Sequence, residues 1–258
     1  MIKQERRNRI LEILAHSGSV EVSQLMALFK VSIETVRRDL EDLEQQQQLV
    51  RVYGGAIVPP AKSAEPVYQK RESANYPQKE AIGKMAAELV NDGDTIAIDL
   101  GTTTMELAKA LKQKKQLTII TNSLKIAALM AENPSFQVIL PGGRVRHGDQ
   151  ALSGSLTARM LSELNTDYAF IGVGGFSLQQ GITDYHMEEA MIRKVMVEHC
   201  QKLVVLFDHS KVGVVAMNQV CPLSAIDIAI TDDGTDPSLL RKLGRYGVNV
   251  LVAKPPQE

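Results

Sequence analysis

The 258-residue sequence contains no tryptophan and few other aromatic residues, six tyrosines and five phenylalanines. A hydrophobic core must therefore be built from aliphatic residues and methionine. Long apolar runs are also missing. No segment approaches the roughly 20 residues that cross a membrane, and the amino-terminal MIKQERRNRI is not followed by an apolar stretch of signal-peptide type. These absences predict a cytoplasmic protein without a membrane partner.

Cysteine and net charge are scarce as well. Cys200 and Cys221 have neither CxxC nor metal-ligand spacing, so we expect reduced, partly buried thiols. The five histidines form no HExxH pattern and no pair four residues apart, and we predict neither a metal nor a cofactor. The formal net charge is −1. Bulk charge therefore gives no argument for nucleic-acid binding, which would have to rest on a local motif.

The pattern of the chain changes near residue 60. Residues 1–57 combine helical patterns with a short strand-like end, and residues 58–77 hold four prolines without an apolar period, which is typical of a linker. Over residues 78–258, helical segments alternate with short apolar runs, and the predicted helices include residues 81–90, 105–111, 124–131 and 188–197. This alternation predicts an α/β fold with a mostly parallel sheet covered on both faces. The predicted strands are residues 95–99, 117–121, 136–140, 168–173, 203–208, 227–231 and 248–253.

Residues 1–57 have the spacing of three short helices followed by a hairpin. We predict helices over residues 5–17, 22–29 and 33–46, with Lys30-Val31 forming a tight turn before the third. Apolar residues at helical spacing give each helix a buried stripe. The positions expected to face inward are Ile10, Ile13, Leu14, Leu25, Leu28, Phe29, Val36, Leu40 and Leu43.

The third predicted helix begins with side chains that suit a DNA major groove. Ser32 stands at the N-cap position, where its oxygen can accept a backbone N–H. Arginine can bind guanine with two hydrogen bonds, and threonine can contact a phosphate or a thymine methyl group. Residues 49–56 have the pattern of a β-wing. The predicted DNA-contacting residues are Ser32, Glu34, Thr35, Arg37, Arg38, Arg51 and Tyr53.

A three-helix bundle with a solvated charged face would show much of the same pattern. However, VEVSQLMALFKVSIETVRRDLEDLE and the following LVRVYGGA resemble the winged helix-turn-helix of DeoR-type bacterial transcriptional regulators. The specific parts are VS-x-x-TVRRDL and R-x-YGGA, and the resemblance implies double-stranded operator DNA as a partner. The family usually has a glycine between the third helix and the wing. This chain has Gln46-Gln47-Gln48 there, which leaves the shape of that turn open.

In the second module, the sharpest candidate site is Asp99-Leu-Gly-Thr-Thr-Thr104, between a strand and a helix. Ligands of open α/β sheets bind outside the carboxyl ends of the strands. Gly101 permits close approach of the backbone, and three threonine hydroxyls lie beside free N–H groups at a helix N-terminus, a combination that binds phosphate. No lysine of Walker type is present, so a single phosphate on a small molecule fits better than a nucleoside triphosphate. A threonine-capped helix without a ligand is the alternative.

Other strand-end turns are weaker signals individually. Gly172-Val-Gly-Gly175 lacks the last glycine of GxGxxG, which excludes a dinucleotide fingerprint, and the consecutive Asp208, His209 and Ser210 do not have the arrangement of a catalytic triad. Lys211 suits either a ligand phosphate or the protein surface. Glu189 and Arg193, four residues apart on a predicted helix, have the spacing of a surface ion pair.

The segments DLGTTT, TNSL, LPGGRVR, EA-x-x-RK and DHSK resemble the sensor domain of DeoR-type regulators, whose fold is similar to ribose-5-phosphate isomerase. The two resemblances account for nearly the whole chain. They imply a phosphorylated sugar as effector and a homo-oligomer, either a dimer or a tetramer. The family usually has Lys then Arg where this chain has Arg193 then Lys194, which keeps the charge but can change bidentate geometry. The implied effector-binding positions are Asp99, Gly101, Thr102, Thr103, Thr104, Asn122, Gly142, Gly143, Glu189 and Lys211.

The sequence thus predicts a DNA-binding repressor of a carbohydrate-utilisation operon that a phosphorylated sugar releases or modulates. An activator or dual regulator of the same kind stays open, because the sign of regulation depends on the position of the operator. The other alternative is a sugar-phosphate isomerase-like enzyme with Asp99 or Glu189 as the base. Since an isomerase does not need a winged module, we predict that the protein is not an enzyme.

Overall fold

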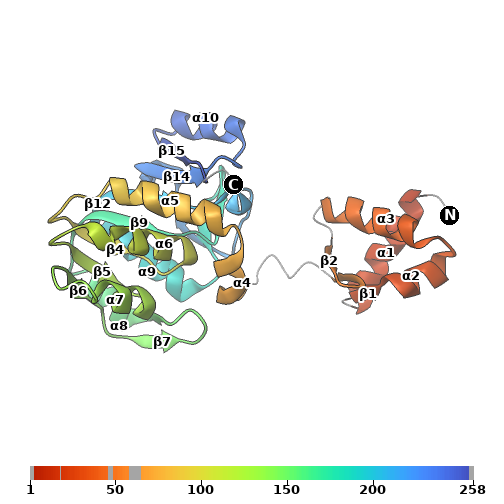
Figure 1. Ribbon diagram of the computed structural model, residues 1–258, viewed down its shortest axis with the longest axis horizontal. Helices are drawn as coiled ribbons and strands as arrows, with labels where there is room; N and C mark the ends of the chain where they lie inside the picture. Colours follow the sequence, from red (N-terminus) through yellow and green to blue (C-terminus); the bar gives the residue numbers. More distant parts are fainter. Residues whose placement is uncertain (1–2, 18, 46–48, 58–64, 256–258) are drawn as a thin grey trace. The chain divides into compact units, whose positions relative to one another are not determined.

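The computed structural model describes residues 3–17, 19–45, 49–57 and 65–255 (Figure 1). The chain divides into two compact units, residues 1–64 and residues 65–258. Within the described residues, no helix has the length and apolar character needed to cross a membrane. Gln46-Gln47-Gln48, where the chain departs from the family pattern, lie outside the described residues.

The first unit consists of three helices and a small antiparallel sheet, and the predicted helices and hairpin are confirmed. One further strand, which the sequence analysis did not identify, joins the hairpin, so the strand order is β1-β3-β2. Gly55 is required at this contact, because a Cβ there would lie 2.0 Å from the carbonyl oxygen of Val20. The elements are α1 (Lys3–Ser17), β1 (Ser19–Glu21), α2 (Val22–Phe29), α3 (Ile33–Gln45), β2 (Val50–Val52) and β3 (Gly55–Ile57).

The predicted apolar stripes form the core of this unit, with one exception. Leu28 is 56% exposed, so the expectation that it faces inward is wrong. Helix α2 spans only two turns, and Leu25 and Phe29, which lie four residues apart, already supply its buried face. Val36, Leu40 and Leu43 are buried on α3 as predicted.

A buried ion pair network joins the first and third helices. Asp39 on α3 is 1% exposed, and its carboxylate accepts hydrogen bonds from Nε of Arg6 and Nε of Arg7 on α1. Arg7 also pairs with Asp42. These acids therefore face α1 and are neutralised there, away from the exposed Arg37 and Arg38.

The second unit is built on a seven-stranded, wholly parallel sheet, and its strands are the seven that the sequence predicts. Near-continuous apolar strands suit such a sheet because both faces are covered. The strand order is β15-β14-β12-β9-β4-β5-β6. The bounds are β4 (Thr95–Ile98), β5 (Thr118–Thr121), β6 (Gln137–Ile139), β9 (Thr166–Ile171), β12 (Cys200–Leu206), β14 (Ile228–Asp232) and β15 (Asn249–Ala253).

Helices cover both faces of this sheet (Figure 1). Alternate side chains of β4 enter different layers: Ile96 and Ile98 pack with α5 to α7, whereas Ala97 packs with α8 to α10. The predicted helices α5, α6, α7 and α9 are confirmed, and the sequence analysis did not identify α8 and α10. The bounds are α5 (Tyr76–Glu88), α6 (Thr102–Ala110), α7 (Leu124–Met130), α8 (Ser155–Leu161), α9 (Met187–Glu198) and α10 (Pro237–Arg245).

The order of the strands creates a crevice beside β4. The chain adds β5 and β6 on one side of β4 and then returns to add β9 on the other, so the connections after β4 and β9 lead in opposite directions. Ligands of open α/β sheets bind at such a switch point. Short strands that the sequence analysis did not identify complete the unit: β7 (Arg144–Arg146), β8 (Ala151–Ser153), β10 (Gly175–Ser177), β11 (Gly181–Asp184) and β13 (Asn218–Cys221).

The expected linker over residues 58–77 is too long. Residues 58–64 lie outside the described residues, but the second unit already begins at Glu65 and includes α4 (Tyr68–Ser73) and the start of α5. Two of the four prolines are compatible with these helices. Pro66 precedes α4, and Pro77 lies in the first turn of α5, where the missing N–H needs no intrahelical partner.

The Asp39 network predicts how sensitive the first unit is to substitution. Asp39→Ala leaves the two buried arginines of α1 without their shared carboxylate, and we expect a loss of about 3–5 kcal/mol in the stability of this unit. Glu41→Ala, at an exposed position of the same helix, is the control and should change stability by less than about 0.5 kcal/mol. The stability of both variants is measured by unfolding the full chain in urea and monitoring hydrogen exchange of the α3 amides. Equal stability of the two variants would contradict the role of this ion pair network.

Candidate functional site

The start of α3 is capped as the sequence predicts. The backbone N–H of Thr35 donates to Oγ of Ser32 at 3.3 Å, and the two side-chain hydroxyl oxygens lie 3.0 Å apart. Arg37 lies 3.7 Å from Glu34 in an exposed pair, which is worth little in water. Arg38 is exposed and has no ion-pair partner among the described residues. This end of α3 therefore presents cationic and hydroxyl groups that are available to nucleic acid.

The hairpin of β2 and β3 lies beside this helix. Arg51 is attached to α3, because its backbone N–H donates to Oε1 of Glu44 at 3.0 Å, while its guanidinium stays 43% exposed. Tyr53, at the turn of the hairpin, is fully exposed. A groove of about 520 Å³ separates α3 from the hairpin, with Arg37 and Arg51 on its walls. The predicted DNA-contacting residues are thus placed on one helix end and one wing.

A second candidate site is a cavity of about 270 Å³ at the carboxyl end of the parallel sheet. Loops that follow three strands line it: residues 100–103 after β4, residues 172–173 after β9, and residues 207–211 after β12. The remaining wall comes from α4, the residues before it, the start of α5 and Arg193 of α9. Of the ten predicted effector positions, those that line the cavity are Gly101, Thr102, Thr103 and Lys211.

The cavity offers two features that attract an anion. The first N–H groups of α6, from Thr102 onward, have no acceptor within the helix and carry the positive end of its dipole. Lys211 lies in the short helix η2 (His209–Lys211), is partly buried, and has no carboxylate within 4.0 Å among the described residues. Burial lowers the pKa of Lys211, although Asp208 opposes this shift. An unpaired lysine beside a helix N-terminus is suited to binding phosphate.

Thr104 has a different role from the two preceding threonines. Its side chain is fully buried, and its hydroxyl donates to the carbonyl oxygen of Gly101 at 3.2 Å. This hydrogen bond therefore stabilises the conformation of the loop, and Thr104 does not line the cavity. A loop fixed in this way can keep the N–H groups of Thr102 and Thr103 oriented without a ligand.

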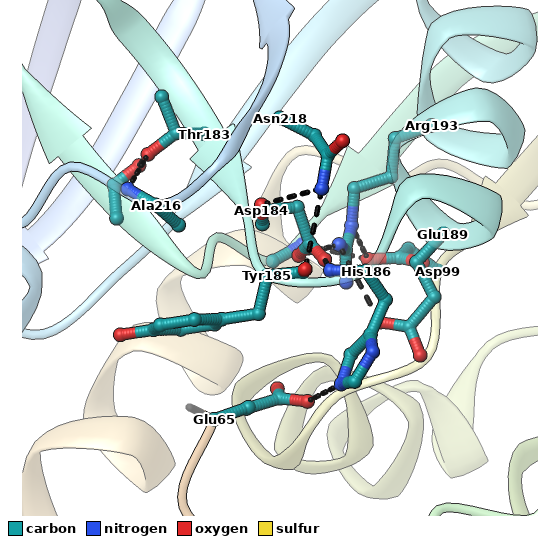
Figure 2. Close-up of polar contacts among 12 residues, drawn as sticks. Glu65, Asp99, Thr183, Asp184, Tyr185, His186, Glu189, Arg193, Ala216 and Asn218 are labelled. Atoms are coloured by element: carbon teal, nitrogen blue, oxygen red, sulfur yellow. Dashed lines mark hydrogen bonds and ion pairs between the residues drawn. The ribbon is translucent and has the colours of Figure 1, made fainter. Parts of the chain in front are cut away.

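In the cavity wall, Arg193 joins three elements (Figure 2). Its Nε donates to Oδ2 of Asp99 at 2.7 Å, its Nη1 binds Asp184, and Glu189 lies 3.8 Å away. Burial opposes the charge of this guanidinium, but Asp184 and Asp99 outweigh burial, and the pKa of Arg193 is raised well above its ordinary value. Glu189 and Arg193 are 2% and 4% exposed, so the interpretation of them as a surface ion pair is wrong.

The guanidinium of Arg146 forms ion pairs with a further group of carboxylates. Nη2 of Arg146 lies 2.7 Å from Glu189 and 3.5 Å from Glu65, and it also binds Asp149. Oxygen atoms of these three acids lie within 4.8 Å of one another, a spacing that could suit a metal ion, but the arginine occupies a position among them. Burial raises the pKa of Glu189 to about 8, against the charges of Arg193 and Arg146.

Like Asp99, Thr104 and Glu189, the last three predicted effector positions do not line the cavity. Asn122, after β5, is fully buried and its Nδ2 donates to the carbonyl oxygen of Leu152 at 3.4 Å. Gly142 accepts a hydrogen bond from the hydroxyl of Thr157 on α8. A Cβ at Gly143 would lie 2.0 Å from that hydroxyl oxygen. Gly143 therefore permits close packing of this loop against α8, whereas a Cβ at Gly142 would make only ordinary contacts, the nearest 3.5 Å away at Sδ of Met160.

The sequence analysis did not identify the cavity residues that come from α4 and its flanks. Arg71 binds Oε1 of Glu65 and Oδ2 of Asp149, each at 2.9 Å, and Asn75 donates to Asp208 at 2.9 Å. Lys79 is buried and donates to the carbonyl oxygens of Arg71 and Ala74. The segment has no apolar period and contains prolines, so its pattern resembled that of a linker.

Two models of known protein families match this chain. Residues 6–61 match the model of the DeoR-like helix-turn-helix domain, and residues 74–233 match the model of the DeoR C terminal sensor domain. The sensor match spans most of the second unit. Each of the two units thus corresponds to one of the two matched domains.

Three similar proteins match along nearly their whole length. The HTH-type transcriptional regulator GolR of Listeria innocua is 34% identical over 97% of this chain and 98% of its own. The HTH-type transcriptional repressor GlcR of Bacillus subtilis is 35% identical, with 98% of both chains covered. The glycerol-3-phosphate regulon repressor of Escherichia coli is 30% identical over 97% of this chain and 99% of its own.

Solved structures provide a more distant likeness. Ribose 5-phosphate isomerase A of Methanocaldococcus jannaschii is 19% identical, covers 54% of this chain and 55% of its own, and gives a TM-score of 0.40. At this TM-score the likeness carries no argument about this chain. The two family matches and the full-length relatives show the function class: the chain is a DNA-binding transcriptional regulator, not an enzyme, and it belongs to the DeoR family.

Proposed function

We propose that this regulator acts in the cytoplasm as a homo-oligomeric repressor of a carbohydrate-utilisation operon and that a phosphorylated sugar binding in the sheet-end cavity modulates its affinity for the operator. The observation that carries this proposal is the juxtaposition of the α6 N-terminus with Lys211, a partly buried cation without a carboxylate partner within 4.0 Å among the described residues. Relatives named as repressors, among them one of a glycerol-3-phosphate regulon, support the same conclusion.

The size of the cavity supports a small ligand. A volume of about 270 Å³ is just below the range of about 300–1,000 Å³ that is usual for small-molecule sites, which favours a ligand as small as a sugar phosphate. The lining combines the anion-binding loop of Gly101–Thr103 and Lys211 with polar side chains such as Asn75 and Ser210. A ligand with one phosphate and several hydroxyl groups fits this distribution of groups.

A thermal-shift screen of the full chain tests the proposal. The panel contains glucose 6-phosphate, fructose 1-phosphate, fructose 6-phosphate and glycerol 3-phosphate, each paired with its unphosphorylated form and with inorganic phosphate. A ligand that binds only the folded state raises the melting temperature by mass action. The proposal expects at least one shift that requires the phosphate group. The absence of a shift with every phosphorylated compound would contradict the proposed effector class.

For DNA, we expect Arg38→Ala to weaken operator binding by about tenfold or more, as for the loss of one arginine that contacts a base. A DNA fragment selected from a random library by the wild-type protein serves as the operator in a fluorescence anisotropy titration. Arg9→Ala is the control, because Arg9 is exposed and paired with Glu12 on α1. If both variants bind this fragment like the wild type, Arg38 is not part of the DNA-contacting surface.

For the effector, we expect Lys211→Met to weaken binding of a phosphorylated hit by about tenfold or more, because a charge-assisted hydrogen bond to phosphate is lost. Isothermal titration calorimetry measures the affinity. Lys194→Met, at an exposed position of α9, should leave it unchanged. Both variants should keep the wild-type affinity for DNA without effector. Unchanged effector affinity in Lys211→Met would remove this lysine from the site.

A further inference from the structure

One wall of the cavity is formed by the first residues of the second unit. Residues 65–75, here named the α4 strap, comprise Glu65, helix α4 and the turn at Asn75. The strap begins where the second unit begins, immediately after residues 58–64. Its residues Glu65, Arg71 and Asn75 all line the cavity. A ligand in the cavity therefore contacts the segment through which the sensor domain is covalently joined to the DNA-binding unit.

Ion pairs fasten the beginning of the strap. The carboxylate of Glu65 is 9% exposed and lies 2.9 Å from Nη1 of Arg71, 3.5 Å from Nη2 of Arg146 and 3.2 Å from Nε2 of His186 (Figure 2 shows the contact with His186). Arg71 is a member of the strap, whereas Arg146 and His186 belong to the body of the sensor domain. Glu65 thus attaches the first residue of the strap to that body.

The negative charge of Glu65 disfavours binding of an anionic ligand in the cavity. The groups suited to bind the anion, the α6 N-terminus and Lys211, line the same cavity of about 270 Å³. A phosphate held there is repelled by the carboxylate of Glu65 and attracted by the guanidinium of Arg71. An arginine fork binds phosphate as readily as it binds carboxylate.

The remaining cations cannot hold Glu65 equally well once Arg71 binds a ligand. Three carboxylates, those of Glu65, Asp149 and Glu189, share the guanidinium of Arg146. All three side chains are nearly buried, at 9%, 6% and 2% exposed for Glu65, Asp149 and Glu189, but only Glu65 is the first residue of the unit. Repulsion within this group therefore acts most easily by displacing Glu65.

We infer that an anionic effector replaces Glu65 as the partner of Arg71 and thereby detaches the start of the α4 strap, so that Arg71 is an effector-binding residue and Glu65 is the switch between the sensor and the DNA-binding unit. This inference rests on the proposed function, since it assigns the regulation of the same cavity. The exchange forms and breaks only ion pairs. It makes opposite predictions for its two residues, which a purely structural role would not.

Affinity for the effector is the first test. The probe is the compound among glucose 6-phosphate, fructose 1-phosphate, fructose 6-phosphate and glycerol 3-phosphate that shifts the melting temperature of the wild type. Isothermal titration calorimetry then measures the affinity of each variant for this probe. Glu65→Gln removes the competing charge and should bind the probe about five- to tenfold more tightly, while Arg71→Gln should bind it about tenfold more weakly. Glu72→Gln, an exposed position on the same helix, is the matched control and should match the wild type.

Hydrogen exchange tests the attachment without any ligand. The N–H groups of Lys70 and Arg71 donate to the carbonyl oxygen of Val67, at the start of α4. These two amides should exchange at least about threefold faster in Glu65→Gln than in Glu72→Gln, because local opening governs their exchange. The same change should follow addition of the probe to the wild type. Equal exchange in the two variants would overturn the inference.

Affinity for DNA tests the coupling. Adding the effector to the wild type either raises or lowers its affinity for the selected DNA fragment. By linkage, Glu65→Gln without effector should change this affinity in the same direction. If no phosphorylated probe binds the wild type, the proposed function and this inference both fail. If a probe binds the wild type and alters its DNA affinity but Glu65→Gln behaves like Glu72→Gln, only the inference fails.

Discussion

The sensor domain depends on one buried guanidinium at the point where the strand order reverses. Arg193 of α9 binds Asp99, which follows β4, and Asp184, at the end of β11. Oδ2 of Asp99 also accepts the N–H of Gly172, which follows β9. The loops on both sides of the switch point are therefore fixed to one side chain. Loss of one partner of such a buried pair typically costs about 3–5 kcal/mol, which makes the arrangement strongly specified.

This arrangement places most of the acids in an inner layer. Lys211 and the N–H groups of α6 face the cavity, whereas Asp99, Asp184, Asp149 and Glu189 lie behind its lining among Arg193, Arg146 and Arg71. The arginines thus neutralise the acids and leave Lys211 available to a ligand. Since Arg193 and Arg71 line the cavity while binding acids of the inner layer, an anion in the cavity alters the balance of charge in both the lining and the inner layer.

The sequence predicted the framework well because the framework is periodic. Seven apolar runs became the seven strands, and Val36, Leu40 and Leu43 became the buried face of α3. Three-residue strands such as β7 and β10 have too few residues to show a period. The prolines of residues 65–77 suggested a linker, although proline is also compatible with the start of a helix.

The candidate site was predictable only where it follows a strand. The DLGTTT and DHSK turns supplied cavity residues, because the carboxyl ends of parallel strands meet at one edge of the sheet. Arg71 comes from a helix without a strand before it, and no local signal distinguishes it from a surface arginine. The spacing of Glu189 and Arg193 suits both a surface pair and a buried one, and only the packing of α9 against the sheet decides between them.

The ion pair network of Asp39 limits how the recognition helix can be exchanged in protein engineering. Asp39 lies on α3, directly after the predicted DNA-contacting residues Arg37 and Arg38, yet its partners Arg6 and Arg7 are on α1. A chimaera that transplants α3 from another regulator into this chain must carry an acid at this position or replace both arginines. Otherwise the two buried arginines lose the carboxylate that they share, and the hybrid is destabilised whatever its DNA preference.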